Sequence, residues 1–463
     1  MTIAIVVVIL LGYVLIACEH ITNVNKSLVA IFCGTVGWVL FMCTGTDFIN
    51  AMHAEEYQAF LDGVQHTVLL SQQFIADHIF LRYVGQVGEL VLYLFATMSI
   101  VEVLTNNECF SFVETILRRR STAQMLWLTV LVTFLLSACI DNLTVTVLML
   151  MILRKLIRNG KQRMYIGSAI VIAASCGGCW TVIGDVTSLM VWGKGAVTAT
   201  NFSAALVLPA IVATVVPTLF IQRRLPEHLD LDRPAYSFRG DDSMLVWWQK
   251  ALLLFFGIGG LWFVPSFHRI TLLPPFLGAL CCLGVVWVLH EIINKSRIRT
   301  EQPQNISSGR KLQYEVLQVM MYCVGVCLCV DVLVEIGAMR AASAWLDANI
   351  HNIYLASAFM GMLSSVLDNI ALVMAGINIY SVGDAVQEGY QASFVENGQY
   401  WHLIALCGNV GGCLLPIGSV AGFALIRAEG VSVWWYFRRI SLYAFLGFAA
   451  SVGTYFLVDH FLR

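Results

Sequence analysis

Long apolar stretches recur along almost the whole chain of 463 residues, and this feature limits the possible folds more than any other. Most of them run for roughly 16–24 residues, close to the length that an α-helix needs to cross a bilayer. They lack the alternation over ~10 residues that is typical of a membrane β-barrel. Charged residues make up only 12% of the chain, about half of the ~25% found in soluble domains. The sequence therefore predicts an all-α polytopic membrane protein.

The composition also argues against several other classes of protein. The net charge of -2 excludes a basic nucleic-acid binder. Most of the 14 cysteines lie inside apolar runs, where they behave as small hydrophobic residues. The ten histidines form no HExxH motif, so we expect neither an enzyme nor a bound cofactor. The first apolar run has no basic segment before it and no cleavage site, and is interpreted as a retained helix.

Ten apolar stretches are expected to cross the membrane, and two are expected to fold back. The first of these two, 122–152, has basic clusters at both ends, which the positive-inside rule places on one side. As one helix it would extend ~46 Å, well beyond a ~30 Å hydrocarbon core. We therefore predict re-entrant hairpins at 122–152 and 352–380. The expected crossings lie near 3–18, 27–44, 88–105, 165–192, 203–222, 245–264, 272–291, 314–337, 401–427 and 435–459.

This arrangement places both termini outside and 22 of the 27 basic residues inside, as the positive-inside rule predicts for a multi-pass membrane protein. The flanks of the second hairpin are acidic, with Asp347, Asp384, Glu388 and Glu396. That hairpin should enter from the opposite face. One hairpin from each side is what an inverted repeat predicts.

Three motifs of the first half recur in the second half, in the same order. Residues 101–104 (VEVL) return at 330–333 (VDVL), and 137–142 (SACIDN) return at 364–369 (SSVLDN). The glycine pair 177–178 and the following IGDV return as the pair 411–412 and IGSV. Three collinear matches with nearly constant spacing indicate an internal duplication.

The duplication suggests four parts of the chain. They are N-terminal scaffold helices and an external arm (1–87), a first inverted repeat (88–222), an inner loop with linking helices (223–313), and a second inverted repeat (314–463).

The repeated motifs carry polar residues into the membrane. A charge at mid-bilayer costs ~2.5–3.5 kcal/mol, so Asp141 and Asp368, expected at the hairpin tips without basic partners, require a cation or a proton. The glycine pairs allow their helices to unwind and free backbone oxygens, and oxygen ligands suit Na+ or Li+. Direct Na+ contacts are expected from Asp141, Asn142, Asp185 and Asp368. The full set of candidate ion-binding and proton-coupling residues is Ser137, Asp141, Asn142, Thr144, Ser175, Asp185, Thr187, Ser188, Ser364, Asp368, Asn369, Asn409 and Ser419.

Each of these features also has a simpler interpretation. Glycine pairs in membrane helices often serve close packing, and Asp-Asn at a turn can cap a helix. Cys176 and Cys179 form a CxxC pattern that we assign to packing rather than to redox or metal chemistry. The halves differ, because Ser419 stands where Asp185 would align. We therefore expect proton coupling in the first half, where two carboxylates converge.

Several segments resemble the NhaD-type sodium:proton antiporters of the ion transporter superfamily. These segments are Glu19-His20, Asn25-Lys26, 101–104, 137–144, 177–192 (GGCWTVIGDVTSLMVW), 364–369 and 408–422. The resemblance covers most of the chain and implies a homodimer with scaffold and transport domains. It also implies elevator-like exchange of Na+ or Li+ for H+, with ion binding by residues that include Asp141, Asn142, Asp185, Thr187, Ser188, Ser364 and Asn369.

Two positions depart from the family pattern, because Ser175 and Val182 stand where Asn and Pro are common. The second half has Asn409 and Pro416 at the equivalent places. A sodium-coupled carboxylate symporter and an oxyanion exporter of the same superfamily remain alternatives. Aspartates at both hairpin tips argue against the symporter, because they would repel a carboxylate substrate.

Overall fold

A computed structural model describes most of the chain, namely residues 2–22, 24–44, 48–49, 52–62, 64–118, 121–229, 245–294, 307–383 and 389–462. Over these residues the protein consists of helices and connecting turns, without a β-strand. The predicted hairpin flanks at Arg119, Arg120, Asp384 and Glu388, and most of the loop 223–244, lie outside the described residues. Seven of the described helical segments are long and apolar enough to cross a membrane, in agreement with a polytopic membrane protein.

The first half of the chain forms thirteen regular elements among the described residues. They are α1 (Thr2–Ala17), α2 (Glu19–Thr22), α3 (Lys26–Thr44), α5 (Ala54–Leu61), α6 (Val68–Phe74), the π-helical turn η1 (Ile75–Phe80), α7 (Leu81–Asn106), α8 (Ser111–Leu117), α9 (Thr122–Ser137), α10 (Asn142–Leu156), α11 (Gly160–Gly178), α12 (Val186–Gly193) and α13 (Ala199–Gln222).

The remaining elements follow the loop at 223–244. They are α14 (Trp247–Leu254), η2 (Phe255–Gly259), α15 (Gly260–Thr271), α16 (Pro275–Ile293), α18 (Ser307–Glu335), α19 (Ala338–Asn349), α20 (Ile353–Leu367), α21 (Asn369–Ile379), the 3-10 turn η3 (Gly389–Phe394), α22 (Gln399–Gly412), α23 (Val420–Glu429), α24 (Val433–Tyr436), η4 (Phe437–Ser441) and α25 (Leu442–Leu462).

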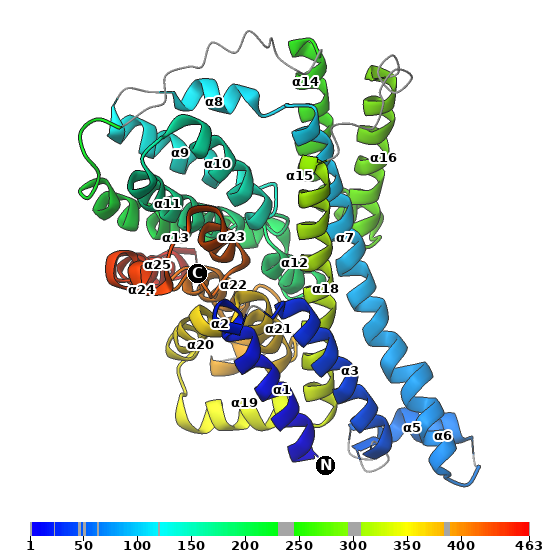
Figure 1. Cartoon of the computed structure of the whole chain (residues 1–463). Coiled ribbons are helices and arrows are strands. Elements are labelled where there is room, and N and C mark those ends of the chain that lie inside the picture. Colours follow the sequence, from blue (N-terminus) through cyan, green and yellow to red (C-terminus); the bar gives the residue numbers. More distant parts are fainter. Residues whose placement is uncertain are drawn as a thin grey trace.

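The helices pack as two groups that lie side by side (Figure 1). In the outer group, α3 and α7 pack on α18, α16 packs on α7, and α15 packs on α16. In the core group, α9 to α13 pack with α20 to α25, and α11 contacts both α22 and α23. The groups meet where α21 contacts α18 and α12 contacts α7. Elements from both halves of the sequence therefore build one core.

Both predicted hairpins are present as helix pairs, α9 with α10 and α20 with α21. Both predicted helix breaks are present as well. The stretch 165–192 is divided between α11 and α12, and the stretch 401–427 is divided between α22 and α23. Each of the other expected crossings coincides with a helix or with helices joined end to end.

The largest difference from the predicted boundaries is at the start of one helix. The helix expected near 88–105 begins at Val68, because α6, η1 and α7 form one helical segment of 39 residues. Polar side chains such as Gln73 and Asp77 lower the hydropathy there but leave the helical backbone intact. The expected external arm is also not wholly exposed, since Tyr57 and Phe74 are buried and pack with ring centroids 5.1 Å apart.

Candidate ion-binding site

The tip of the first hairpin is held by a helix cap. Asp141 precedes α10, and its Oδ2 accepts hydrogen bonds from the backbone N–H of Leu143 at 3.1 Å and of Thr144 at 3.3 Å. Ser137, at the end of α9, donates its hydroxyl to the carbonyl of Ala174 at 2.6 Å. Asp141 is 7% exposed. The cap fixes a buried carboxylate at the turn, and Ser137 ties that turn to α11.

The first helix break brings a second carboxylate to the same place. Asp185 caps α12 by accepting from the N–H of Thr187 at 3.2 Å, and it also accepts from the Thr187 hydroxyl. The break packs tightly on the hairpin tip, because a Cβ on Gly184 would lie 2.6 Å from the carbonyl oxygen of Ser137. The Thr181 hydroxyl also donates to the carbonyl of Ala138 at 2.6 Å, which ties the break that carries Asp185 to the turn that carries Asp141.

The second half repeats this construction with different side chains. Ser364 donates to the carbonyl of Gly408 at 2.7 Å, as Ser137 does to Ala174. Asp368 caps α21 by accepting from the N–H of Ile370 at 3.1 Å. Ser419 caps α23 by accepting from Gly422 at 3.1 Å, in the place that Asp185 has in the first half. The helix-cap interpretation of the two Asp-Asn motifs is thus confirmed.

The glycine pairs have both of the roles considered for them. They end α11 and α22 at the breaks, and they also allow close backbone packing. A Cβ on Gly178 would lie 2.9 Å from the carbonyl oxygen of Gly184, and one on Gly412 would lie 2.8 Å from that of Gly418. The same backbone contact therefore recurs in both halves.

A chain of buried hydrogen bonds joins the two halves. Asn369 donates to the side-chain oxygen of Asn409 at 2.8 Å. Asn409 in turn donates to the Thr187 hydroxyl at 2.7 Å, and Thr187 donates to Asp185. The side-chain oxygen of Asn369 is buried without a hydrogen-bond partner. We call Asp141, Asp185, Thr187, Asn369 and Asn409 the cross-half site.

Other predicted residues lie around the cross-half site in different settings. Ser188 donates to the carbonyl of Gly178 at a long 3.4 Å. Ser175 is buried in α11. Asn142 and Thr144 are buried in the first turn of α10. The hydroxyls of Ser137 and Ser364 donate to backbone carbonyls of α11 and α22, and so tie the two hairpins to these helices.

The expectation that both tip aspartates lack a basic partner is wrong for Asp368. Lys26 Nζ lies 2.5 Å from Asp368 Oδ2, and the two side chains are 10% and 2% exposed. Lys26 begins α3, which is 342 residues earlier in the chain. Hydropathy placed Lys26 at the end of a span, and no local pattern indicates a pairing over that distance.

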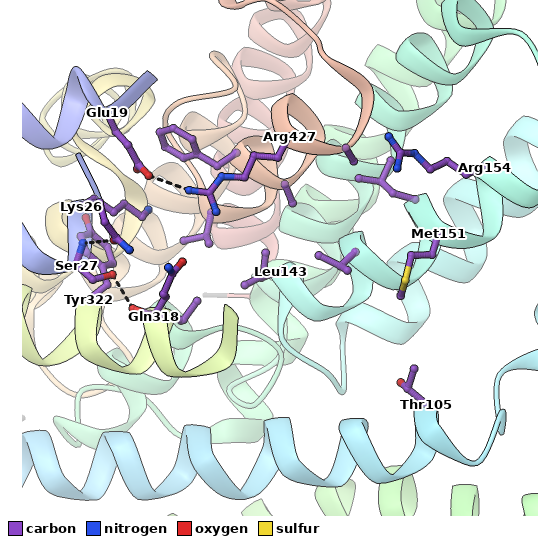
Figure 2. Close-up of a pocket in the computed structure, with 18 of the residues that line it drawn as sticks. Glu19, Lys26, Ser27, Thr105, Leu143, Met151, Arg154, Gln318, Tyr322 and Arg427 are labelled. Atoms are coloured by element: carbon purple, nitrogen blue, oxygen red, sulfur yellow. Dashed lines mark hydrogen bonds and ion pairs between the residues drawn. The ribbon is translucent and has the colours of Figure 1, made fainter. Parts of the chain in front are cut away.

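A cavity of about 740 Å³ lies between the two helix groups, and Figure 2 shows its lining. Lys26, Ser27 and Tyr322 line one end, and Met151 and Arg154 line the other. Leu143 and Val420, which directly follow the hairpin tip and the second break, also line this larger cavity. The larger cavity therefore reaches the first turns of α10 and α23.

Each of the three cationic residues that line the larger cavity is paired with a carboxylate. Besides the Lys26 pair, Arg427 lies 3.0 Å from Glu19, and Arg154 lies 2.7 Å from Glu429. These pairs join residues distant in sequence, and sequence reasoning did not predict them.

A smaller cavity of about 220 Å³ lies further along α7 and α18, away from the larger one. It is lined by Glu89, Leu189, Lys194, Asp331 and Asn378, among others. Leu189 directly follows Ser188 in α12. The two cavities thus lie at different heights along α7 and α18, and both adjoin the core group.

Comparison with known proteins identifies relatives that are described as transporters or antiporters. A family model described as "Citrate transporter" matches residues 13–395. Sodium/proton antiporter 2 of Arabidopsis thaliana is 30% identical over 452 residues, which cover 97% of this chain and 98% of the relative. Sodium/proton antiporter 1 of the same plant is 34% identical over 376 residues, or 81% of this chain and 63% of that longer relative.

A bacterial relative, the Na(+)/H(+) antiporter NhaD of Alkalimonas amylolytica, is 26% identical over 80% of this chain and 77% of its own length. The family model covers most of the chain, and the plant relative aligns from end to end. The chain therefore belongs to the citrate transporter family and, within it, to the NhaD-type sodium:proton antiporters.

Proposed function

We propose that this protein is a secondary active transporter that exchanges Na+ or Li+ for H+. The observation that carries the proposal is the pair of buried carboxylates, Asp141 and Asp185, at the start of two helices in the core. Among the described residues, neither forms an ion pair. Two like charges in one buried site cannot both stay ionised at low cost. The site favours either a cation or a proton, and competition between them is what exchange requires.

The remaining ligands are proposed from neutral oxygen groups around the carboxylates. Asn142, Thr187 and Ser188 lie in the first turns of α10 and α12, and the Ser175 hydroxyl belongs to a buried residue of α11. The break between α11 and α12 removes backbone carbonyls from helical hydrogen bonding. Na+ and Li+ bind such oxygen ligands by the same chemistry as other hard cations.

We infer that transport moves the core group relative to the outer group. The cross-half site is built wholly from core helices, whereas the cavities are lined by both groups. An elevator-like displacement of the core would carry the bound ion from one cavity towards the other. The proposal also includes two inverted repeats, a homodimer, and both termini on the outer face of a bacterial inner membrane.

Symport of a carboxylate and export of an oxyanion are the competing functions. An organic anion in the larger cavity would need an available positive charge. Lys26, Arg154 and Arg427, the cationic residues of its lining, are each engaged by a carboxylate. This favours a small cation as the transported ion.

The test uses proteoliposomes with an acidic interior. We expect uptake of 22Na+ that depends on the pH gradient and is lost when an ionophore collapses the gradient. Labelled succinate, citrate and arsenite, offered with Na+, should not accumulate above the level of protein-free liposomes. Uptake of one of these anions without gradient-dependent 22Na+ uptake would refute the proposal and favour the corresponding alternative.

A further inference from the structure

The two hairpin tips differ in how their aspartates are neutralised. Asp141 and Asp368 occupy equivalent positions, and each caps the second helix of its hairpin. Among the described residues Asp141 has no ion pair. Asp368 has the Lys26 ammonium at 2.5 Å. A protein side chain thus supplies the positive charge at one tip only.

The Lys26 ammonium is enclosed by its surroundings. Nζ lies 4.2 Å from the ring centroid of Tyr322 and 5.1 Å from that of Phe423, so aromatic faces add to its stabilisation. Glu19, a carboxylate that lines the same cavity, pairs with Arg427 at 3.0 Å. Among the described residues, Asp368 is the carboxylate that lies within ion-pair distance of Lys26.

Lys26 is anchored in the outer group, whereas Asp368 belongs to the core. Its helix α3 packs closely on α18, since a Cβ on Gly34 would lie 2.8 Å from the Cβ of Leu328. The neighbouring Ser27 hydroxyl donates to the carbonyl of Gln318 in α18 at 2.7 Å. These contacts fix the start of α3 beside the second hairpin tip.

We propose that Lys26 is a tethered cation that occupies the cation position of the second half, so that each chain binds one exchangeable Na+, in the cross-half site. The inference rests on the proposed exchange function. The charge and the position of the ammonium match those of an ion bound to a tip carboxylate. Removing this ammonium would free Asp368 beside the unpartnered side-chain oxygen of Asn369, and these oxygens suit a small hard cation.

The test is the number of Na+ ions bound per chain, measured with 22Na+ at equilibrium on purified, monodisperse protein. We expect one ion for the wild type and two for Lys26→Gln, a twofold change. Lys26→Met, whose unbranched apolar side chain keeps the packing against Tyr322 and Phe423, should also bind two. Lys26→Arg retains the charge and should bind one. Lys26→Gln combined with Asp368→Asn should return to one.

The outcomes separate this inference from the proposed function. Two ions on the wild type, or one ion on folded Lys26→Gln and Lys26→Met, would overturn the tethered-cation assignment and leave exchange intact. A wild-type count of two overturns the assignment even when a neutral variant does not fold. No Na+ on the wild type at any pH between about 6 and 9 would instead refute the proposed function.

Discussion

At the scale of single residues, the site depends on carboxylates that also cap helices. Asp141 and Asp185 each accept backbone N–H groups at a helix start, which holds them in place without a permanent countercharge. Ser419, which has the place of Asp185 in the second half, caps its helix equally well but carries no charge. Capping therefore does not in itself require a carboxylate at these positions.

Replacing Asp185 by Asn keeps a helix cap and removes the charge. We expect Asp185→Asn and Asp141→Asn each to reduce Na+-dependent proton movement to the level of protein-free liposomes. The protein should still be folded and inserted. Asp77→Asn, the same substitution at an exposed position of η1, serves as the control and should transport like the wild type. Normal exchange in Asp185→Asn would show that the coupling site has been assigned to the wrong residues.

Thr187 tests the connection between the halves. Its hydroxyl accepts from Asn409 and donates to Asp185, so Thr187→Val leaves the buried Asn409 amide without its acceptor and leaves Asp185 with the backbone N–H of Thr187 but without the hydroxyl. A lost buried hydrogen bond costs about 1–3 kcal/mol. We therefore expect the apparent dissociation constant for Na+ to rise about tenfold. Thr187→Ser should restore the wild-type value. An unchanged constant in Thr187→Val would mean that the hydrogen-bond chain does not support ion binding.

At the scale of elements, the breaks are fixed by backbone contacts that require glycine. A Cβ on Gly184 would lie 2.6 Å from the carbonyl oxygen of Ser137, and one on Gly418 would lie 2.6 Å from that of Ser365. The sequence predicted both breaks because the glycine motifs recur. It did not predict which backbone each glycine meets, because those contacts join separate helices.

Gly184→Ala should force the first break away from the hairpin. Overpacking of this kind costs about 1–3 kcal/mol, and we expect a fall in the Tm of several degrees together with weaker Na+ binding. Gly453→Ala in α25 is the matched control, because a Cβ there meets nothing within 4 Å. A Gly184→Ala protein with unchanged Tm and Na+ binding would contradict the close packing of break and tip.

A histidine outside the membrane-spanning segments links the start of α5 to the end of α18. His53 Nε2 lies 2.9 Å from Glu335 Oε2, and this hydrogen bond raises the pKa of His53 above its usual 6.5. The stabilising effect of the charged imidazole is therefore fully present below pH 6.5. It is lost as the pH rises through the higher pKa of the folded protein.

We expect His53→Gln to lower the Tm relative to the wild type at about pH 5, and the difference to shrink as the pH rises above 6.5. His460→Gln, at an exposed position, should show no pH-dependent difference. A Tm difference that grows as the pH rises would contradict the pairing with Glu335.

At the scale of the whole molecule, the apolar pattern, the basic flanks and the recurring motifs together predicted the helices, the two hairpins and the two breaks. Hydropathy and motif recurrence report on local sequence, and these elements are local. The pairing of Lys26 with Asp368, the link from Thr187 to Asn409, and the extension of α7 back to Val68 were not predicted. The first two depend on tertiary contacts, and the third on a helix that continues through polar residues.

The proposed site would need both halves of the chain. Asp185 and Thr187 come from the first half, and Asn369 and Asn409 from the second, yet hydrogen bonds connect them in one buried chain. Neither half alone would complete the site. A displacement of the core would therefore carry all of its ligands together.

The most direct test of competition between Na+ and H+ is the release of protons when Na+ is added to purified protein in weakly buffered solution. The account predicts that NaCl, but not choline chloride, releases protons from the wild type between about pH 6 and pH 9, in an amount that follows the bound Na+. Asp141→Asn and Asp185→Asn should release none. Na+ binding to the wild type without proton release at any of these pH values would contradict a shared site.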